Sequence, residues 1–430
     1  MLNVLITSLV LAGLLAQSPS DSVTVHLRPA EISAIPRIMP KVIVIRPQSL
    51  NLTNEYPETL IKIPVNLKKP VFGSLKFGVA GVEKTILIGV DESDDDKPPR
   101  ILVDANTNGD LTDDPPLTPY KSRFVRNNGT TLTEYTVAPT IPMEYEDGAK
   151  SLLTLNIRWI DPADVRRSNG NHPILYFANY FTTGEIALGG HTYRIALSDT
   201  LAKGDFRGRP EGETSGIMLL MDINGNEAFD GKGESVDIRQ PFNIKGTTYQ
   251  VTSADPSGQT LTITKSKKSV AEILPPPDLR VGKPVVPFEG ATIGGKRINF
   301  PKDYHGVTLL YFWGSWCGDC KAEVPFMAKA WAQLKDKGLA FLGISLDFPN
   351  EGKQFTEFVK SNKLPPDQIY AGKHWSAEIA VLYGVTSIPT AYLVNSITGK
   401  VIAGGDDLIG ERLIPTLEKM LAHHNRDKKQ

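Results

Sequence analysis

The most informative part of the last third of this chain is Phe312-Trp-Gly-Ser-Trp-Cys-Gly-Asp-Cys-Lys-Ala-Glu-Val-Pro325. It holds the only two cysteines of the 430 residues, Cys317 and Cys320. The apolar run 307–312 precedes it and is typical of a buried strand, and a helical pattern over 321–337 follows it. The cysteines therefore lie where a strand passes into a helix. The free N–H groups and partial positive charge of a helix N-terminus stabilise a thiolate there.

Two sulfurs separated by two residues can close into a small disulfide at the head of the helix. We expect Cys317, nearer the strand, to attack a substrate disulfide, and Cys320, one turn into the helix, to resolve the mixed disulfide. Two other roles stay open. A static structural disulfide would close too short a loop to constrain the unfolded chain much. Half of a metal site would need ligands that no further cysteine and no suitably spaced histidine supplies.

The rest of the C-terminal part alternates between strand and helix patterns. Strands are predicted over 339–346 and 390–394, and helices over 352–362 and 410–423. A sheet covered by helices, an α/β domain over 280–430, is the fold class that this alternation indicates.

This domain resembles the TlpA/ResA-like group of extracytoplasmic thioredoxin-like proteins, within the redoxin superfamily. The resemblance rests on the Trp-Cys-x-x-Cys stretch, on residues 282–300, on Tyr383-Gly-Val-Thr-Ser-Ile-Pro-Thr390 and on the turn 395–400. It spans about residues 278–425. It implies a thioredoxin-like fold that exchanges its dithiol with protein disulfides, needs no cofactor for that exchange and receives electrons from a membrane or soluble protein.

The resemblance also implies roles for individual residues. Ile388 and Pro389 would face the cysteines across a cis peptide bond, ready for an extended substrate strand, and Trp316 would cover the sulfurs. Pro389 as an ordinary proline at a strand start and Trp316 as core packing are the alternatives. A peroxiredoxin is disfavoured, because its Pro-x-x-x-Thr-x-x-Cys arrangement is missing here.

Asp319 stands where many relatives carry proline. A carboxylate beside a developing thiolate is unfavourable, so we expect Asp319 to raise the pKa of the nucleophilic thiol and to make the couple more reducing. The alternative is that the side chain points to solvent and does little.

Residues 21–270 carry strand signals, with short β-rich runs between Gly, Pro, Asn and Asp clusters. A weak repeat relates residues 86–110 to residues 194–227, and we therefore divide the region into two related β-rich units, 21–150 and 151–270. A Pro-rich linker, 271–279, separates them from the C-terminal domain.

Each β unit contains a loop with oxygen side chains at alternate positions, the pattern that opens a calcium loop. The candidate ligands are Asp104, Asn106, Asn108 and Asp110 in the first loop, and Asp222, Asn224, Asn226 and Asp230 in the second. Neither loop is an EF-hand: Pro115 stands where the bidentate glutamate belongs, so Asp113 or Asp114 would have to substitute, and Asp230 or Glu234 would close the second loop. Hairpin turns are the competing interpretation of both loops. Asp94-Asp-Asp96 is interpreted as a solvated loop.

Forty-seven basic and forty-eight acidic residues give a formal charge of −1, which removes the electrostatic case for nucleic-acid binding. Residues 1–20 are apolar and end in small residues, as in a secretory signal peptide. We expect export to the periplasm or another extracytoplasmic compartment, with this segment cleaved after Ser20 or kept as an anchor; a buried N-terminal element is the alternative.

Two functions fit these features. The first is an exported thiol–disulfide oxidoreductase that acts as a reductant. The second is a calcium-dependent or surface-binding protein in which the redox domain is accessory.

Overall fold

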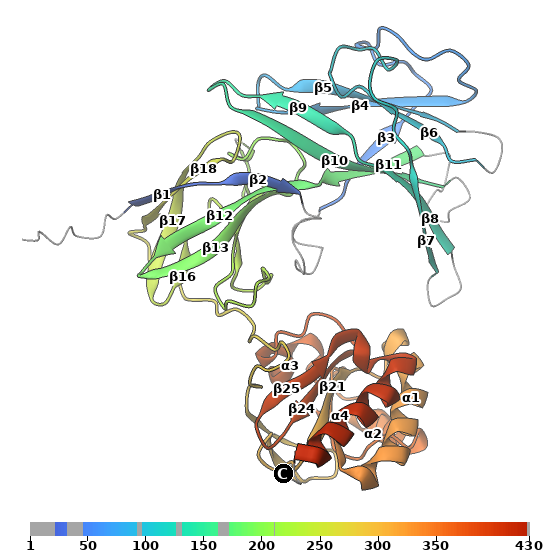
Figure 1. Cartoon of the computed structure of the whole chain (residues 1–430), viewed down its shortest axis with the longest axis vertical. Coiled ribbons are helices and arrows are strands. Elements are labelled where there is room, and N and C mark those ends of the chain that lie inside the picture. The colour runs from blue at the N-terminus through green and yellow to red at the C-terminus, as the bar shows by residue number, and fades with distance from the viewer. Residues whose placement is uncertain are drawn as a thin grey trace, which may run out of the picture.

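The computed structural model describes residues 22–31, 46–92, 97–125, 131–161, 172–209 and 211–427. Figure 1 shows a strand-rich N-terminal region and an α/β C-terminal domain, joined by one extended segment. The predicted signal peptide, 1–20, and the acidic run 94–96 lie outside the described residues. Within the described ranges, no helix has the length and apolar character needed to cross a bilayer.

The described residues of the N-terminal region form four antiparallel sheets. The first has the order β1-β18-β17-β16 and the second the order β15-β14-β13-β12-β2. The bounds of their strands are β1 (Ser22–His26), β2 (Arg28–Glu31), β12 (Tyr180–Leu188), β13 (His191–Asp199), β14 (Ile217–Met221), β15 (Ser235–Asp237), β16 (Phe242–Ile244), β17 (Thr247–Ala254) and β18 (Thr260–Lys265).

The other two sheets lie earlier in the chain. One has the order β3-β11-β10-β8-β7 with β9 also paired to β10, and the other has the order β4-β5-β6. Their bounds are β3 (Gln48–Leu52), β4 (Pro70–Phe77), β5 (Lys84–Asp91), β6 (Arg100–Val103), β7 (Tyr120–Val125), β8 (Thr131–Val137), β9 (Thr140–Glu144), β10 (Lys150–Ile160) and β11 (His172–Ala178). Strand β9 alternates strictly between exposed and buried residues, as a half-buried strand must.

The predicted β-rich character of this region is confirmed, but two related units are not. Strand β10 begins at Lys150 and pairs with β8 and β9 on one side of the predicted boundary and with β11 on the other. Strand β1 pairs with β18, more than 230 residues later, and β2 pairs with β12, about 150 residues later. Buried side chains from all four sheets, from Leu27 to Ile263, form one continuous core. The resemblance between the halves is local: β6 and β14 each pair with the preceding long strand and lead into an Asp-Asn loop.

The C-terminal domain has a central sheet in the order β23-β22-β21-β24-β25, in which β21, β22 and β23 pair in parallel and β24 pairs antiparallel with both β21 and β25. A hairpin of β19 and β20 precedes it. The strand bounds are β19 (Phe288–Ala291), β20 (Arg297–Phe300), β21 (Val307–Trp313), β22 (Leu339–Ser345), β23 (Gln368–Tyr370), β24 (Thr390–Asn395) and β25 (Lys400–Gly404). The helices are α1 (Gly318–Leu334), α2 (Gly352–Ser361), α3 (Glu378–Leu382) and α4 (Leu413–Asp427), with 3-10 turns η2 (Lys335–Lys337), η3 (His374–Ser376), η4 (Gly405–Leu408) and η5 (Gly410–Arg412).

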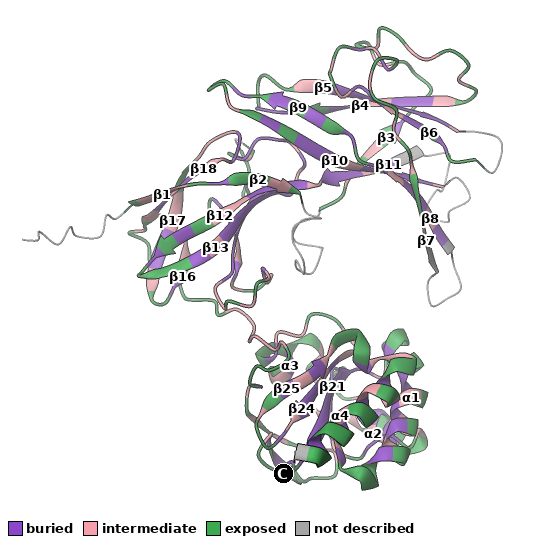
Figure 2. Ribbon diagram, in the orientation of Figure 1, coloured by how far each residue is buried: buried purple, intermediate pink, exposed green. Residues whose placement is uncertain are grey.

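Strand β21 is buried along its whole length because both faces of the sheet are covered. Its alternate residues enter two cores: Leu309 and Tyr311 pack with α1, α2 and α4, whereas Leu310 and Phe312 pack with α3 and the β19-β20 hairpin. Figure 2 shows the sheet strands buried and the outer helix faces exposed. The predicted α/β domain is confirmed.

The linker predicted at 271–279 has no regular secondary structure and is exposed or half-buried. It is held to the N-terminal region at its start, where Glu272 accepts a hydrogen bond from the Lys245 N–H at 2.7 Å. At its end, Pro276 lies against Gly384 of the C-terminal domain so closely that a Cβ on Gly384 would come within 2.2 Å of it.

Candidate active site

The two cysteines lie at the start of α1. Cys317 has extended backbone angles and is the N-cap, and its sulfur accepts a hydrogen bond from the Cys320 N–H at 3.2 Å. The Sγ atoms lie 2.6 Å apart. Cys317 is 8% exposed and Cys320 is fully buried. One sulfur is therefore within reach of a substrate, and the other can be reached only through the first.

Burial is the main reason that the pKa of Cys320 lies well above its ordinary value, and its hydrogen bond to Cys317 adds to the rise. The negative charge of the Asp319 carboxylate adds less to this rise than burial and the hydrogen bond do. Asp319 itself is exposed. Cys320 is therefore held as a neutral thiol in the reduced form, and the predicted influence of Asp319 on the nucleophile stays a prediction.

A loop from the other end of the domain faces Cys317. The Ile388–Pro389 peptide bond is cis, as expected, and the Ile388 carbonyl oxygen lies 3.8 Å from Cys317 Sγ. Both residues are half-buried and lead directly into β24. The family resemblance implied this position beside the cysteines, and the structure brings both residues there across about seventy residues of chain.

Trp316 belongs to an aromatic cluster beside the cysteines. Its Nε1–H donates to the Leu346 carbonyl at 2.8 Å, and its ring centroid lies 4.9 Å from that of His374. Phe348 stacks on His374 at 4.2 Å, and Trp375 packs edge-on against Trp316 at 6.3 Å. The rings of Trp316, Phe348 and Trp375 are each about 40% exposed, so the cluster offers an apolar surface next to Cys317. That Trp316 also covers the sulfurs stays a prediction.

Glycine is required at position 314 because Trp316 folds back onto it. A Cβ on Gly314 would lie 2.6 Å from Trp316 Nε1. The Gly314 carbonyl also accepts the Cys317 N–H at 3.1 Å, which sets the turn before the helix.

Asp347 fixes this turn from the neighbouring strand and was missed by the sequence reasoning. It is fully buried and accepts hydrogen bonds from the backbone N–H and the hydroxyl of Ser315 and from the hydroxyl of Ser345. Its own carbonyl accepts the His374 N–H at 3.1 Å. A polar residue directly after an apolar parallel strand was the available signal, since such strand ends meet at one edge of the sheet.

Two more polar residues lie behind the cysteines. Glu323 is 8% exposed and accepts the Gly410 N–H at 2.7 Å, and Tyr311 is fully buried. Burial raises the pKa of Tyr311, and the nearby charges of Glu323 and both cysteines raise it further. The signal for Glu323 was present in the sequence: it follows Cys320 by three residues, which places both on one helix face.

The first predicted calcium loop is assembled only in part. Asp104 is buried and accepts the N–H groups of Asn108 and Gly109, while Asn106 and Asn108 donate their side-chain amides to Asp113. Asp110, by contrast, pairs with Lys62 at 2.9 Å and accepts from Thr112. The structure therefore groups Asp113 with the two asparagines in place of Asp110.

The second loop brings its four predicted residues together. Asn224 and Asn226 donate their side-chain amides to Asp230 Oδ2 at 3.0 and 2.9 Å, and Asp222 accepts the Glu227 N–H at 3.1 Å. Glu234 closes the loop by accepting three backbone N–H groups, from Ile223, Asn224 and Asp230. In the described ranges no three Cys, His, Asp or Glu side chains are grouped as a metal site, so any ion here would depend on asparagine carbonyls as well.

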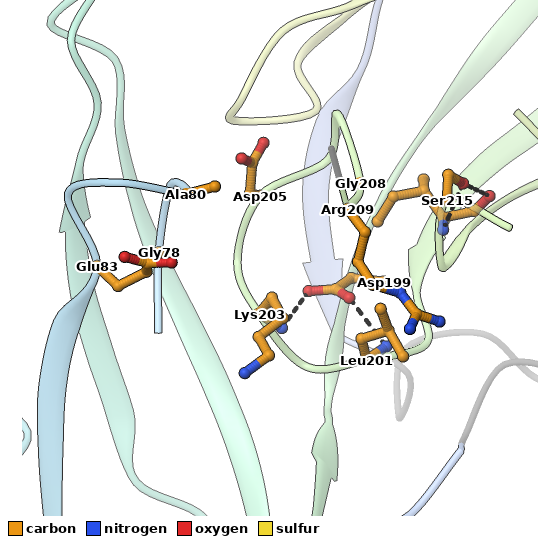
Figure 3. A pocket seen from close by; sticks show the side chains of 11 residues that line it. Gly78, Ala80, Glu83, Asp199, Leu201, Lys203, Asp205, Gly208, Arg209 and Ser215 are labelled. Carbon is orange, nitrogen blue, oxygen red and sulfur yellow. Dashed lines mark hydrogen bonds between the residues drawn. The ribbon is translucent and has the colours of Figure 1, made fainter. Parts of the chain in front are cut away.

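The N-terminal region also contains a pocket, drawn in Figure 3, that shares no lining residue with the cysteine site. Asp199 lines this pocket, and both of its carboxylate oxygens accept hydrogen bonds. The donors are the N–H groups of Leu201, Lys203 and Gly204 and the Tyr180 hydroxyl. Burial nonetheless raises its pKa. Asp199 therefore stabilises the conformation of the loop that follows β13 through these hydrogen bonds.

The comparisons with known proteins concern the C-terminal domain. A family model described as the AhpC/TSA family matches residues 281–402. The thiol-disulfide oxidoreductase ResA of Bacillus thuringiensis subsp. konkukian (strain 97-27) is 34% identical over 145 residues, which are 33% of this chain and 78% of that protein. The sporulation thiol-disulfide oxidoreductase A of Bacillus subtilis (strain 168) is 31% identical over 116 residues, 26% of this chain and 68% of that protein.

A solved structure, the thioredoxin domain of a thiol-disulfide oxidoreductase from Bacteroides vulgatus, is 25% identical and covers 33% of this chain and 99% of its own, with a TM-score of 0.30. Both curated relatives match the part of the chain that carries the Trp-Cys-x-x-Cys stretch. Through its C-terminal domain, the chain belongs to the family of ResA-like thiol-disulfide oxidoreductases.

Proposed function

We propose that this protein is an exported reductant of protein disulfides that works through Cys317 and Cys320. One observation carries the proposal: the two sulfurs lie 2.6 Å apart at the N-terminus of α1, one partly accessible and one buried, opposite the Ile388 carbonyl. That arrangement suits an attacking thiol and a resolving thiol beside a backbone edge that can pair with an extended substrate.

The exchange has two steps. The Cys317 thiolate attacks one sulfur of a substrate disulfide, forms a mixed disulfide and releases the other substrate sulfur as a thiolate. The Cys320 sulfur, after losing its proton, attacks Cys317 Sγ and releases the second substrate thiol. Two electrons pass to the substrate and the protein is left as the 317–320 disulfide, which a dithiol donor protein must reduce again. No cofactor is needed for either step.

The reducing direction is supported by the surroundings of Cys320. A couple is a strong oxidant when its reduced form is stabilised as a thiolate. Here burial holds Cys320 as a thiol, and Asp319 adds negative charge nearby. We therefore expect a reduction potential below about −200 mV, on the side of thioredoxin and away from strongly oxidising relatives.

Export is supported by the apolar segment 1–20 and by the restriction of cysteine to one redox pair, which suits an oxidising compartment. The redox relatives do not favour the calcium-dependent or surface-binding function as the main one. The substrates we propose are disulfide-bonded proteins, and the electron donor is a membrane or soluble dithiol protein.

The test is insulin reduction by the full chain, by Cys317→Ser and by Cys320→Ser, with the potential of the pair measured against glutathione. Both variants should lose at least about 100-fold in rate, because nucleophile and resolving thiol act as a unit. Cys320→Ser alone should accumulate a mixed disulfide with substrate. Turnover by Cys317→Ser at the wild-type rate would overturn the assignment, and a potential above about −150 mV would overturn the direction.

A further inference from the structure

The loop after β14 contains a buried acceptor without a donor. Asp222 is 9% exposed, and its Oδ2 is held by the Glu227 N–H at 3.1 Å and lies 3.5 Å from the Arg194 guanidinium. Its Oδ1 is buried and has no hydrogen-bond partner among the described residues. A buried carboxylate oxygen without a hydrogen-bond partner lowers the free energy of unfolding, unless a water molecule or a bound ion interacts with it.

Apart from the Arg194 guanidinium beside its Oδ2, Asp222 shares this loop with residues that carry hard oxygen donors. The side-chain carbonyls of Asn224 and Asn226 each accept one backbone N–H and so keep a lone pair free, and the Asp230 carboxylate joins both asparagines. Histidine and cysteine are missing from this loop. Such a set of oxygen ligands suits calcium in preference to zinc or copper.

The same pattern recurs in the loop after β6. Asp104 has the position of Asp222, with an oxygen held by the N–H of the residue five positions on. In both loops one aspartate gathers the amides of two asparagines, Asp113 in the first and Asp230 in the second. The first loop also contains a buried oxygen without a partner, Asp114 Oδ2. Two segments far apart in the chain therefore share the ligand order, and each contains a buried oxygen without a partner, although at different positions: on Asp222 in the second loop and on Asp114 in the first.

We propose that the loop 222–230 binds one calcium ion through Asp222 Oδ1, the carbonyls of Asn224 and Asn226, and Asp230, and that the ion stiffens the junction with the C-terminal domain. This goes beyond the redox function and does not depend on it.

The second half of the proposal rests on what the loop touches. Asn224 donates to the Pro276 carbonyl of the linker at 3.0 Å, and the Gly225 carbonyl accepts from Arg280 at 3.0 Å. Arg280 also lies 3.4 Å from Glu227. An ion that orders this loop therefore orders the segment from which the C-terminal domain extends.

The first experiment is calcium titration of the chelator-treated full chain by calorimetry and thermal melting, with magnesium at equal ionic strength. Calcium should bind with a Kd between about 10⁻⁴ and 10⁻³ M, the range of extracellular modules. At ~100-fold above Kd, the melting temperature of the N-terminal region should rise by roughly 5–10 °C. Absence of heat and of any melting shift up to about 10 mM calcium would overturn the proposal.

The variants Asp222→Asn and Asp230→Asn should each remove one equivalent of bound calcium, whereas Glu213→Gln, the same charge change on an exposed residue, should retain it. Full stoichiometry in both loop variants would place any bound ion elsewhere and overturn the site. If either Asp222→Asn or Asp230→Asn does not fold, the calcium stoichiometry of the other variant still tests whether this loop binds the ion.

Trypsin tests the junction. Calcium should slow cleavage after Arg280 several-fold while leaving cleavage after the exposed Lys267 and Lys268 unchanged. Equal cleavage after Arg280 with and without bound calcium would overturn the stiffening.

Discussion

At the scale of single residues, the two cysteines differ more in their surroundings than their symmetric spacing suggests. Cys317 is partly accessible and caps the helix, whereas Cys320 is fully buried. A substrate therefore meets the sulfurs in a fixed order. The order follows from helix geometry, because a residue three positions into α1 turns back into the core.

The raised pKa of Cys320 predicts an unusual pH dependence of its alkylation. In the reduced Cys317→Ser variant burial remains, so the thiolate fraction of Cys320 stays small at neutral pH. Its rate with iodoacetamide should still be rising above pH 9, where an ordinary thiol with a pKa of about 8.5 has nearly levelled off. Mass spectrometry of timed samples gives the rate. The same variant unfolded in urea is the control and should level off normally; a plateau near pH 8.5 in the folded variant would contradict the burial argument.

At the scale of elements, α1 is tied to the segment before α4 by one buried carboxylate. Glu323 accepts the N–H of Gly410, the first residue of η5. Removing the acceptor leaves that N–H without a partner, so Glu323→Ala should lower the free energy of unfolding of this domain by about 1–3 kcal/mol. Glu323→Gln keeps an acceptor oxygen and should lower it by less than about 1 kcal/mol.

Urea unfolding followed by tryptophan fluorescence measures this difference, since four of the five tryptophans lie in the C-terminal domain. Equal destabilisation by the two substitutions would show that the charge of Glu323, and not its hydrogen bond, holds α1 in place.

An element could be predicted from the sequence when its pattern is local, and could not when its partner strand lies far away along the chain. In the C-terminal domain, strands β21, β22 and β24 and helices α1, α2 and α4 were predicted within a few residues, because each has its own periodicity. Helix α1 begins at Gly318, three residues before the predicted start, because Cys317 is the cap. The short elements β23, β25 and α3 were not predicted. The N-terminal sheets were not predictable in this way: β1 pairs with β18 across more than 230 residues, and no local pattern indicates such a partner.

The candidate site shows the same limit. Cys317 and Cys320 could be named from the Cys-x-x-Cys motif, and Ile388 and Pro389 from the resemblance to a known family. Phe348, His374 and Trp375 could not, since they come from two loops that meet Trp316 only after the parallel strands are in register.

At the scale of the whole molecule, the N-terminal region and the C-terminal domain have separate cores. The two clusters of the C-terminal domain contain no residue before Leu279, and the N-terminal core contains none after Ile263. The polar contacts from the loop 222–230 reach the linker and Arg280, at the edge of the domain. The cysteine site is therefore complete within the C-terminal domain.

A fragment of residues 271–430, which keeps Pro276 against Gly384, should thus fold alone and reduce insulin within about twofold of the full chain, since none of the described N-terminal side chains orients the reacting sulfurs. The fragment with Cys317→Ser is the matched control for background thiol reactivity. Circular dichroism and the melting temperature establish that the fragment is folded before rates are compared. A folded fragment that is tenfold slower on insulin, yet equal on a small-molecule disulfide, would mean that the N-terminal sheets hold the protein substrate. Slower turnover on both would mean that they shape the cysteine site itself, which separate cores argue against.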